Sequence, residues 1–131
     1  MAYKDEFGKN IAIVGASADR ERFSNKAVRA FVEEGYTVFP VHPKEEMIEG
    51  LKAYKSVKDV PGKVDFVSVY LNPEISLKIG LAKQLKEKGI KAAILNPGAG
   101  SEELVKSLEK EGIKVLQECS IRGLGRYPDE F

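Results

Sequence analysis

The sequence is poor in the residues that support covalent and metal-dependent chemistry. Its 131 residues include one cysteine, Cys119, one histidine, His42, and no tryptophan. A lone cysteine excludes an internal disulfide and fits a reducing intracellular compartment. One histidine and one cysteine also fall short of the ligand set of a zinc site. We therefore expect neither a disulfide-stapled fold nor a metal centre.

An excess of charge of either sign is also missing, as are long apolar runs. The 21 basic and 20 acidic residues give a formal net charge of +1, which offers no general attraction to nucleic acid or to an anionic membrane. No apolar stretch approaches the roughly 20 residues that cross a bilayer. The first residues are too charged for a signal peptide. We expect a cytoplasmic protein without nucleic-acid or membrane partners, in which any anion site is local.

The length favours a single domain over residues 1–131. Gly35, Gly89 and Gly112 each separate a helical pattern from an apolar run, where glycine commonly ends a helix. The apolar runs show little alternation, as is typical of parallel strands that are buried on both faces; they are 11–14, 37–41, 64–71, 92–95 and 115–116. These patterns predict an α/β fold, a single Rossmann-like doubly wound sheet of about five parallel strands in the order 3-2-1-4-5.

Four of the predicted strand ends are rich in Gly, Pro, Asn or Ser, and we expect them to meet in one crevice. Ligands of open parallel sheets bind outside the carboxyl ends of the strands, here between the first and fourth strands. Small residues let backbone N–H groups approach a ligand, and the start of a helix favours phosphate. The candidate binding residues are Gly15, Ala16, Ser17, Ser24, Asn25, Lys26, Val41, His42, Pro43, Lys44, Leu71, Asn72, Pro73, Asn96, Pro97 and Gly98.

The end of the second predicted strand argues against NAD. The turn at Gly15 lacks the two later glycines of the dinucleotide-binding fingerprint. NAD-binding domains place a carboxylate after the second strand for the ribose, whereas His42 and Lys44 stand there in this chain. These residues suit a ribose phosphate or a diphosphate. The sequence therefore predicts a nucleotide site for a differently phosphorylated ligand.

From Ile11 to Cys119 the sequence resembles the CoA-binding domain family. These are small Rossmann-type domains, similar to the N-terminal domain of the succinyl-CoA synthetase α subunit and of ADP-forming acyl-CoA synthetases. The specific part of the resemblance is the segment from Val41 to Pro43, followed by Gly50-Leu51 and by Tyr54 to Val57. The resemblance implies coenzyme A as the cofactor.

The resemblance also implies a role for each segment of the crevice. The turn at Gly15, with the start of the following helix, holds the CoA phosphates. Val41 and Pro43 flank the adenine, and Lys44 meets a ribose or diphosphate oxygen. Residues 71–73 line the adenosine side, and residues 96–98 guide the pantetheine arm. The sequence departs from the synthetases at Glu118, where they have asparagine, and it shows neither their phosphorylated histidine nor their nucleotide-grasp domains.

The residues supply no catalytic constellation. His42 and Cys119 are the only base and thiol, and the predicted order separates their strands by three spacings, roughly 14 Å. Direct proton transfer needs roughly 3 Å. We therefore predict a stand-alone CoA-binding or acyl-CoA-binding protein that is not catalytic by itself. Two alternatives stay open, a subunit of an acyl-CoA synthetase that needs a partner chain and an NAD-binding redox regulator.

Two further expectations concern the end of the sequence. The exposed edges of a five-stranded sheet, together with Tyr127 and Phe131, are compatible with a homodimer. Cys119 follows the last strand on the ligand side, which makes it a candidate for a mixed disulfide with the thiol of bound CoA. The connector 44–63 is polar and is expected to run over the surface, with a short helix near residues 56–60.

Overall fold

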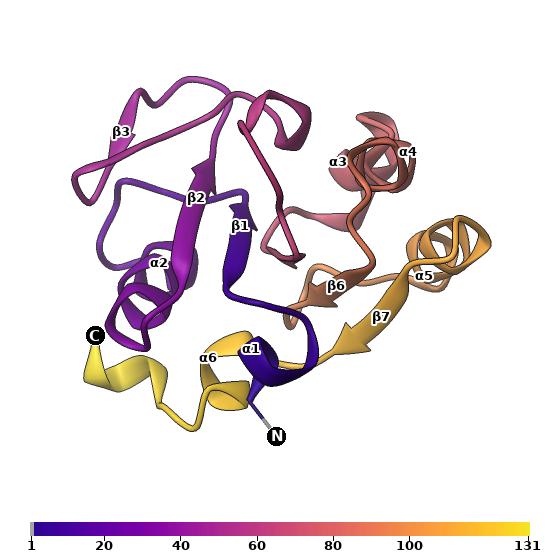
Figure 1. The fold of residues 1–131 in the computed structure, drawn as a ribbon. Helices are drawn as coiled ribbons and strands as arrows, with labels where there is room; N and C mark the ends of the chain where they lie inside the picture. Colours follow the sequence, from indigo (N-terminus) through magenta and orange to yellow (C-terminus); the bar gives the residue numbers. More distant parts are fainter. Residues whose placement is uncertain (1) are drawn as a thin grey trace.

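A parallel sheet of five strands forms the centre of the computed structural model, which describes residues 2–131 (Figure 1). Each strand pairs in parallel with its neighbours. The order across the sheet is β2-β1-β5-β6-β7. The strands are β1 (Asn10–Val14), β2 (Thr37–Val41), β5 (Phe66–Val69), β6 (Ala92–Leu95) and β7 (Lys114–Gln117). The α/β class and the parallel five-stranded sheet are thus confirmed.

The predicted strand order is wrong in one respect. β5, the third predicted strand, pairs with β1 and not with the outer edge of β2. That edge is occupied by the connector itself, since Tyr54 forms a single parallel bridge with Val41. Tyr54 also accepts a hydrogen bond from the His42 N–H and donates one to the Pro40 carbonyl, both at 2.9 Å. All four residues of β5 are buried, which suits a central place covered on both faces.

Helices cover both faces of the sheet (Figure 1). The helices on one face are α1 (Tyr3–Glu6), α2 (Phe23–Glu33) and α6 (Ser120–Gly123); those on the other face are α3 (Pro73–Lys78), α4 (Leu81–Lys88) and α5 (Glu102–Lys110). Alternate residues of β1 point into the two cores, one on each face of the sheet. Ile11 and Ile13 pack in the core under α2, whereas Ala12 and Val14 pack in the core under α4 and α5. This alternation explains why the strand sequences are almost continuously apolar.

Two elements differ from the pattern that the sequence suggests. In the sequence, Leu77, Leu81 and Leu85 recur at helical spacing after Asn72, as in one helix. The structure divides this segment into α3 and α4, because Gly80 between them takes a left-handed φ of 67°. The connector between β2 and β5 is more than a polar surface segment. It contains the unpredicted hairpin β3 (Met47–Ile48) and β4 (Leu51–Lys52), and the 3-10 turn η1 (Val57–Asp59) lies where a short helix was expected. Its apolar side chains Ile48, Val57 and Val60 are buried.

The residues after β7 fold back against α2. They form α6 and the 3-10 turn η2 (Pro128–Glu130). The Arg126 guanidinium donates hydrogen bonds to Glu34 at 2.8 Å, to Glu130 at 2.9 Å and to Glu33 at 3.3 Å. This segment therefore has a defined place on the fold. Across residues 2–131, no helix combines the length and the hydropathy of a membrane span.

Candidate functional site

The turn after β1 is shaped by Gly15. Its φ is 86°, a conformation that costs little only for glycine. A Cβ at this position would lie 2.9 Å from Cδ2 of Leu71, on the loop that follows β5. The Gly15 and Ala16 N–H groups both donate to the Val41 carbonyl, at 3.1 Å. These two amides, which the sequence assigned to phosphate, are therefore engaged by β2.

Other amides of the same loop remain available for an anion. Within residues 2–131, no protein acceptor is found for the N–H groups of Ser17, Ala18, Phe23 and Ser24. Phe23 and Ser24 open α2, an 11-residue helix, so their N–H groups stand at its positive end. The phosphate-binding donors are thus expected one or more residues later than the glycine itself.

Asn25 anchors this loop through hydrogen bonds of its buried side chain. Its side chain is fully buried. The amide nitrogen donates to the Ser17 carbonyl at 2.9 Å and to Glu49 at 3.1 Å, and the amide oxygen accepts from Arg29 Nε at 2.8 Å. Arg29 also donates to the Arg20 carbonyl at 2.9 Å. Asn25 therefore positions the loop, and both N–H groups of its amide are already used within the protein, so neither is free to donate to a phosphate.

The neighbouring predicted residues have their own local partners. The Ser17 hydroxyl accepts from the Asp19 N–H at 3.0 Å. Ser24 is buried, and the Lys26 ammonium lies 5.6 Å from the centre of the Phe23 ring. Because these side chains have partners within the protein or are buried, the backbone N–H groups of the loop are the groups best placed to contact an anion.

His42 shapes the turn after β2. Its Nδ1 accepts hydrogen bonds from the N–H groups of Lys44 and Glu45, both at 3.0 Å. Nδ1 must be unprotonated to accept them. His42 is half-buried, and the adjacent Pro43 and Lys44 are exposed. The His42 side chain therefore stabilises the backbone of this turn, and Lys44 is the exposed cation at this strand end.

An apolar cleft of about 180 Å³ opens beside the Gly15 turn. It brings together four of the predicted residues, Gly15, Val41, Pro43 and Leu71. Asn72 and Pro73 lie next to it but serve the helix start, since the Asn72 side chain accepts from the Glu74 N–H at 2.7 Å and Pro73 is the first residue of α3. The remaining lining residues were not predicted; they are Val14, Lys55, Ser56, Val57, Ile75, Ile79, Leu81 and Gln84.

The sequence contained one signal for these missed residues, the apolar side chains of Ile75 and Ile79 at helical spacing near a predicted strand end. In the structure these two side chains are 47% and 44% exposed. They add apolar surface to the mouth of the cleft, which a planar apolar group would cover. Ser56 and Val57 lie in the segment that carried the family resemblance, but their place within a long connector gave no indication that they reach the strand ends.

Asn96 stands apart from this cleft. It is buried, and its amide nitrogen donates to Ser68 Oγ at 2.8 Å and to the Val69 carbonyl at 2.9 Å. Its amide oxygen accepts from the Ser120 N–H at 2.8 Å. Pro97 and Gly98 are exposed and line a second cavity of about 180 Å³ above β6 and β7. The structure therefore does not bring residues 96–98 into contact with the Gly15 cleft.

The only histidine and the only cysteine of the sequence lie far apart. His42 follows β2, and the half-buried Cys119 follows β7, the opposite edge of the sheet. The observed order puts four strand spacings between them, roughly 19 Å. This separation is larger than the predicted one and rules out a Cys–His pair within the chain.

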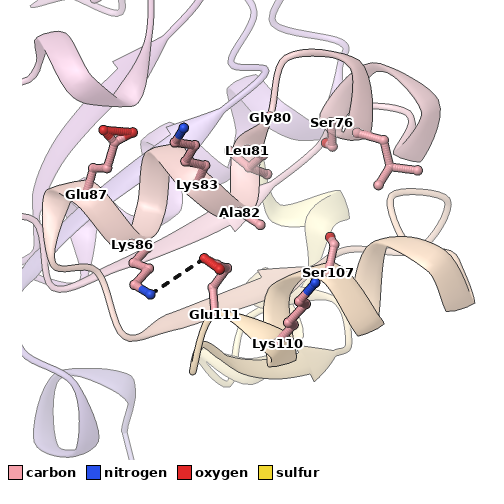
Figure 2. A pocket seen from close by; sticks show the side chains of 11 residues that line it. Ser76, Gly80, Leu81, Ala82, Lys83, Lys86, Glu87, Ser107, Lys110 and Glu111 are labelled. Atoms are coloured by element: carbon pink, nitrogen blue, oxygen red, sulfur yellow. Dashed lines mark ion pairs between the residues drawn. The ribbon is translucent and has the colours of Figure 1, made fainter.

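A larger cavity lies away from the strand ends. It is a groove of about 710 Å³ between α3, α4 and α5, with Leu77, Leu81 and Ala82 among its lining residues. Figure 2 shows lysine and glutamate side chains along its rim, where Lys86 and Glu111 form an ion pair at 3.8 Å. Its lining includes no strand-to-helix glycine turn, which distinguishes it from the smaller cleft beside Gly15.

Residues 9–123 match the CoA binding domain family. The chain belongs to this family. The CoA-binding domain is 35% identical over 120 residues to the α subunit of ADP-forming acetate–CoA ligase II of Pyrococcus furiosus. That match covers 89% of this chain but 26% of the ligase subunit, so the domain spans about a quarter of its relative.

Smaller proteins also resemble the CoA-binding domain. The uncharacterized protein YneT of Bacillus subtilis is 30% identical over 114 residues, which cover 87% of this chain and 83% of that protein. The solved structure of a hypothetical protein from Pyrococcus horikoshii OT3 superimposes with a TM-score of 0.83 at 32% identity, covering 91% of this chain and 82% of that one. The domain thus occurs both within long synthetase subunits and in chains of nearly its own size.

Proposed function

We propose that this chain binds coenzyme A or an acyl-CoA, with the diphosphate at the β1–α2 loop and the adenine in the adjacent cleft. One observation supports this most directly: an apolar cleft of about 180 Å³ adjoins a glycine turn followed by backbone amides without protein acceptors in residues 2–131. A planar base suits the cleft, and a diphosphate suits the amides and the start of α2.

The charged residues around the cleft favour CoA over NAD. Lys44 is exposed after β2, where an NAD site carries a carboxylate. Lys55 lines the cleft from the connector. In the proposed complex these two lysines meet the phosphate on the ribose, and the pantetheine arm leads toward β6, where Pro97 and Gly98 line the second cavity. In this arrangement the thiol end of the pantetheine arm points toward β7, which Cys119 follows.

Calorimetry with CoA, dephospho-CoA, NAD and ATP tests the proposal on the unmodified chain. We expect CoA to bind most tightly, with dephospho-CoA weaker because it lacks the ribose phosphate. Equal or tighter binding of NAD would refute the assignment and favour the dinucleotide alternative.

We further propose that the chain catalyses no reaction by itself, because its only histidine and its only cysteine follow opposite edges of the sheet. The similarity to a ligase α subunit favours one second candidate, a binding subunit that acts with a partner chain. Incubation with acetate, ATP and CoA separates the two. Acetyl-CoA formed by the chain alone contradicts the first proposal, and formation only after a nucleotide-grasp chain is added supports the second.

A further inference from the structure

Two arginines of the β1–α2 loop, Arg20 and Arg22, each form an ion pair with a nearby carboxylate. Arg20 Nε lies 3.4 Å from Glu49 Oε2, and Arg22 Nε lies 4.0 Å from Asp19 Oδ2. Both arginine side chains are largely exposed, at 65% and 73%. Exposed ion pairs of this kind are weak, so either arginine can exchange its partner at little cost.

Glu49 reaches this loop from an unusual backbone position. It sits in the turn between β3 and β4, and in Figure 1 that hairpin lies beyond β2, next to the loop that leads to α2. Its φ is 51°, and within residues 2–131 no other residue apart from glycine has a positive φ. Gly50 follows with a φ of 77°. Such turns favour asparagine or aspartate before the glycine, so the turn itself does not explain a glutamate.

The Glu49 carboxylate is directed at the loop. Its Oε2 accepts from the Asn25 amide at 3.1 Å and pairs with Arg20, and the side chain is only 23% exposed. Asn25 in turn holds the Ser17 carbonyl at 2.9 Å. The carboxylate is therefore fixed beside the same loop whose amides are open to an anion.

We propose that Glu49 is an internal counter-anion of the diphosphate site, which holds Arg20 in the free protein and yields it to the ligand. This inference rests on the proposed function. The loop and its surroundings carry four basic side chains, Arg20, Arg22, Lys26 and Arg29, against three acidic ones, Asp19, Glu21 and Glu49, so the acidic side chains offset most of the positive charge that an anion would meet. A diphosphate that replaces Glu49 as the partner of Arg20 still meets the repulsion of the nearby carboxylate. Glu49 thus lowers the affinity for anions and sets the concentration at which the site fills.

The substitution Glu49→Gln tests this role, because it keeps the side-chain length and an oxygen for Asn25 but removes the charge. We expect the Kd for CoA, measured by calorimetry at low ionic strength, to fall about three- to fivefold. The gain should shrink in about 1 M salt, where the Debye length is ~3 Å. Dephospho-CoA should show the same gain, because it keeps the diphosphate.

Glu109→Gln is the matched control, since it removes one exposed carboxylate on α5 and should leave the Kd unchanged. Adding Arg20→Gln to Glu49→Gln should raise the Kd again, because the arginine that Glu49 would yield to the diphosphate is gone. Unchanged or weaker binding by Glu49→Gln, with normal binding by the unsubstituted chain, would overturn the counter-anion role and leave the proposed function standing. A gain confined to CoA and absent with dephospho-CoA would also overturn it. If the unsubstituted chain does not bind CoA, the proposed function itself is wrong.

Discussion

Gly15 has two independent reasons to be glycine. Its φ of 86° lies in the left-handed region, where any Cβ is strained. A Cβ there would also press on the Leu71 side chain, whose Cδ2 is 2.9 Å away. Leu71 lines the apolar cleft. A side chain at position 15 therefore affects both the backbone and the shape of the proposed adenine site.

The pair Gly15→Ala and Gly35→Ala separates these two effects. Gly35 has the same φ of 86°, but a methyl group added there would meet no atom within 4 Å. The backbone strain should lower the free energy of unfolding of each variant by about 1–2 kcal/mol, measured by denaturant titration. Gly15→Ala should lose more than Gly35→Ala, because its Cβ also meets Leu71. Only Gly15→Ala should weaken CoA binding, by about tenfold or 1.4 kcal/mol in calorimetry. Similar Kd values for the two variants would place the ligand elsewhere.

Two asparagines show what a single sequence cannot distinguish. Asn25 and Asn96 were predicted as ligand contacts because they stand at a helix start and at a strand end. Both are buried, at 0% and 2% exposure, with both ends of each amide hydrogen-bonded inside the protein. An amide that builds a site and an amide that touches its ligand occupy the same positions along the chain. Their difference is one of side-chain direction, which the sequence pattern does not contain.

Among the elements of the sheet, a buried polar cluster joins β5, β6 and α6. The Ser68 and Ser120 hydroxyls lie 2.8 Å apart, and Asn96 bridges both strands to the start of α6. The Tyr70 hydroxyl lies 3.3 Å from Ser120 Oγ. Burial raises the pKa of Tyr70 to about 12, although its hydrogen bond to Ser120 works in the opposite direction. Burial therefore outweighs the hydrogen bonds of the cluster and favours the protonated phenol.

This raised pKa predicts a loss of stability in alkali. In the unfolded chain Tyr70 titrates near pH 10, so above pH 10 the unfolded state loses the proton that the folded state keeps. The contribution is complete below pH 10 and is lost as the pH rises toward about 12. We expect a fall of at most about 2–3 kcal/mol from this residue. Tyr70→Phe should flatten the profile of unfolding free energy over that range.

The flattening should be partial, because burial also raises the pKa of Tyr3 and of Tyr36. Tyr36→Phe is the variant whose pH profile is compared with that of Tyr70→Phe. Tyr36 lies at the opposite end of the sheet, where its hydroxyl accepts from the Lys4 N–H. An unchanged slope in Tyr70→Phe would show that burial does not hold this phenol in its protonated form.

For the molecule as a whole, the class of fold follows from local signals, but the strand order does not. The apolar runs and the helix-ending glycines predicted five parallel strands, and all five are present. The order depended on which segment pairs with the outer edge of β2. That segment is Tyr54, a single bridge inside a polar connector. A single bridging residue produces no periodic sequence pattern. The sequence therefore gave no indication that Tyr54, and not β5, pairs with the outer edge of β2.

The surfaces that favoured a homodimer are already partly covered within the chain. The Arg122 guanidinium lies 3.9 Å from the centre of the Tyr127 ring, and Arg126 lies 4.8 Å from that of Phe131. β7 remains as an edge strand, with Lys114 exposed and paired to Glu6. A charged lysine on an edge opposes pairing with a second sheet. The homodimer stays a prediction, which native mass spectrometry tests.

Ligand binding should stabilise the molecule as a unit, because the proposed site joins residues that follow β1, β2 and β5. A ligand bound only by the folded state at 100 times its Kd adds about 2.7 kcal/mol. For a domain of this size that corresponds to a rise in Tm of roughly 5–15 °C. CoA should produce this rise in differential scanning calorimetry, and NAD at the same concentration should produce little. Gly15→Ala should require about tenfold more CoA for the same rise, whereas Gly35→Ala should respond as the unsubstituted chain does. Because both variants carry the same backbone strain, a difference between them reports the cleft and not the overall stability.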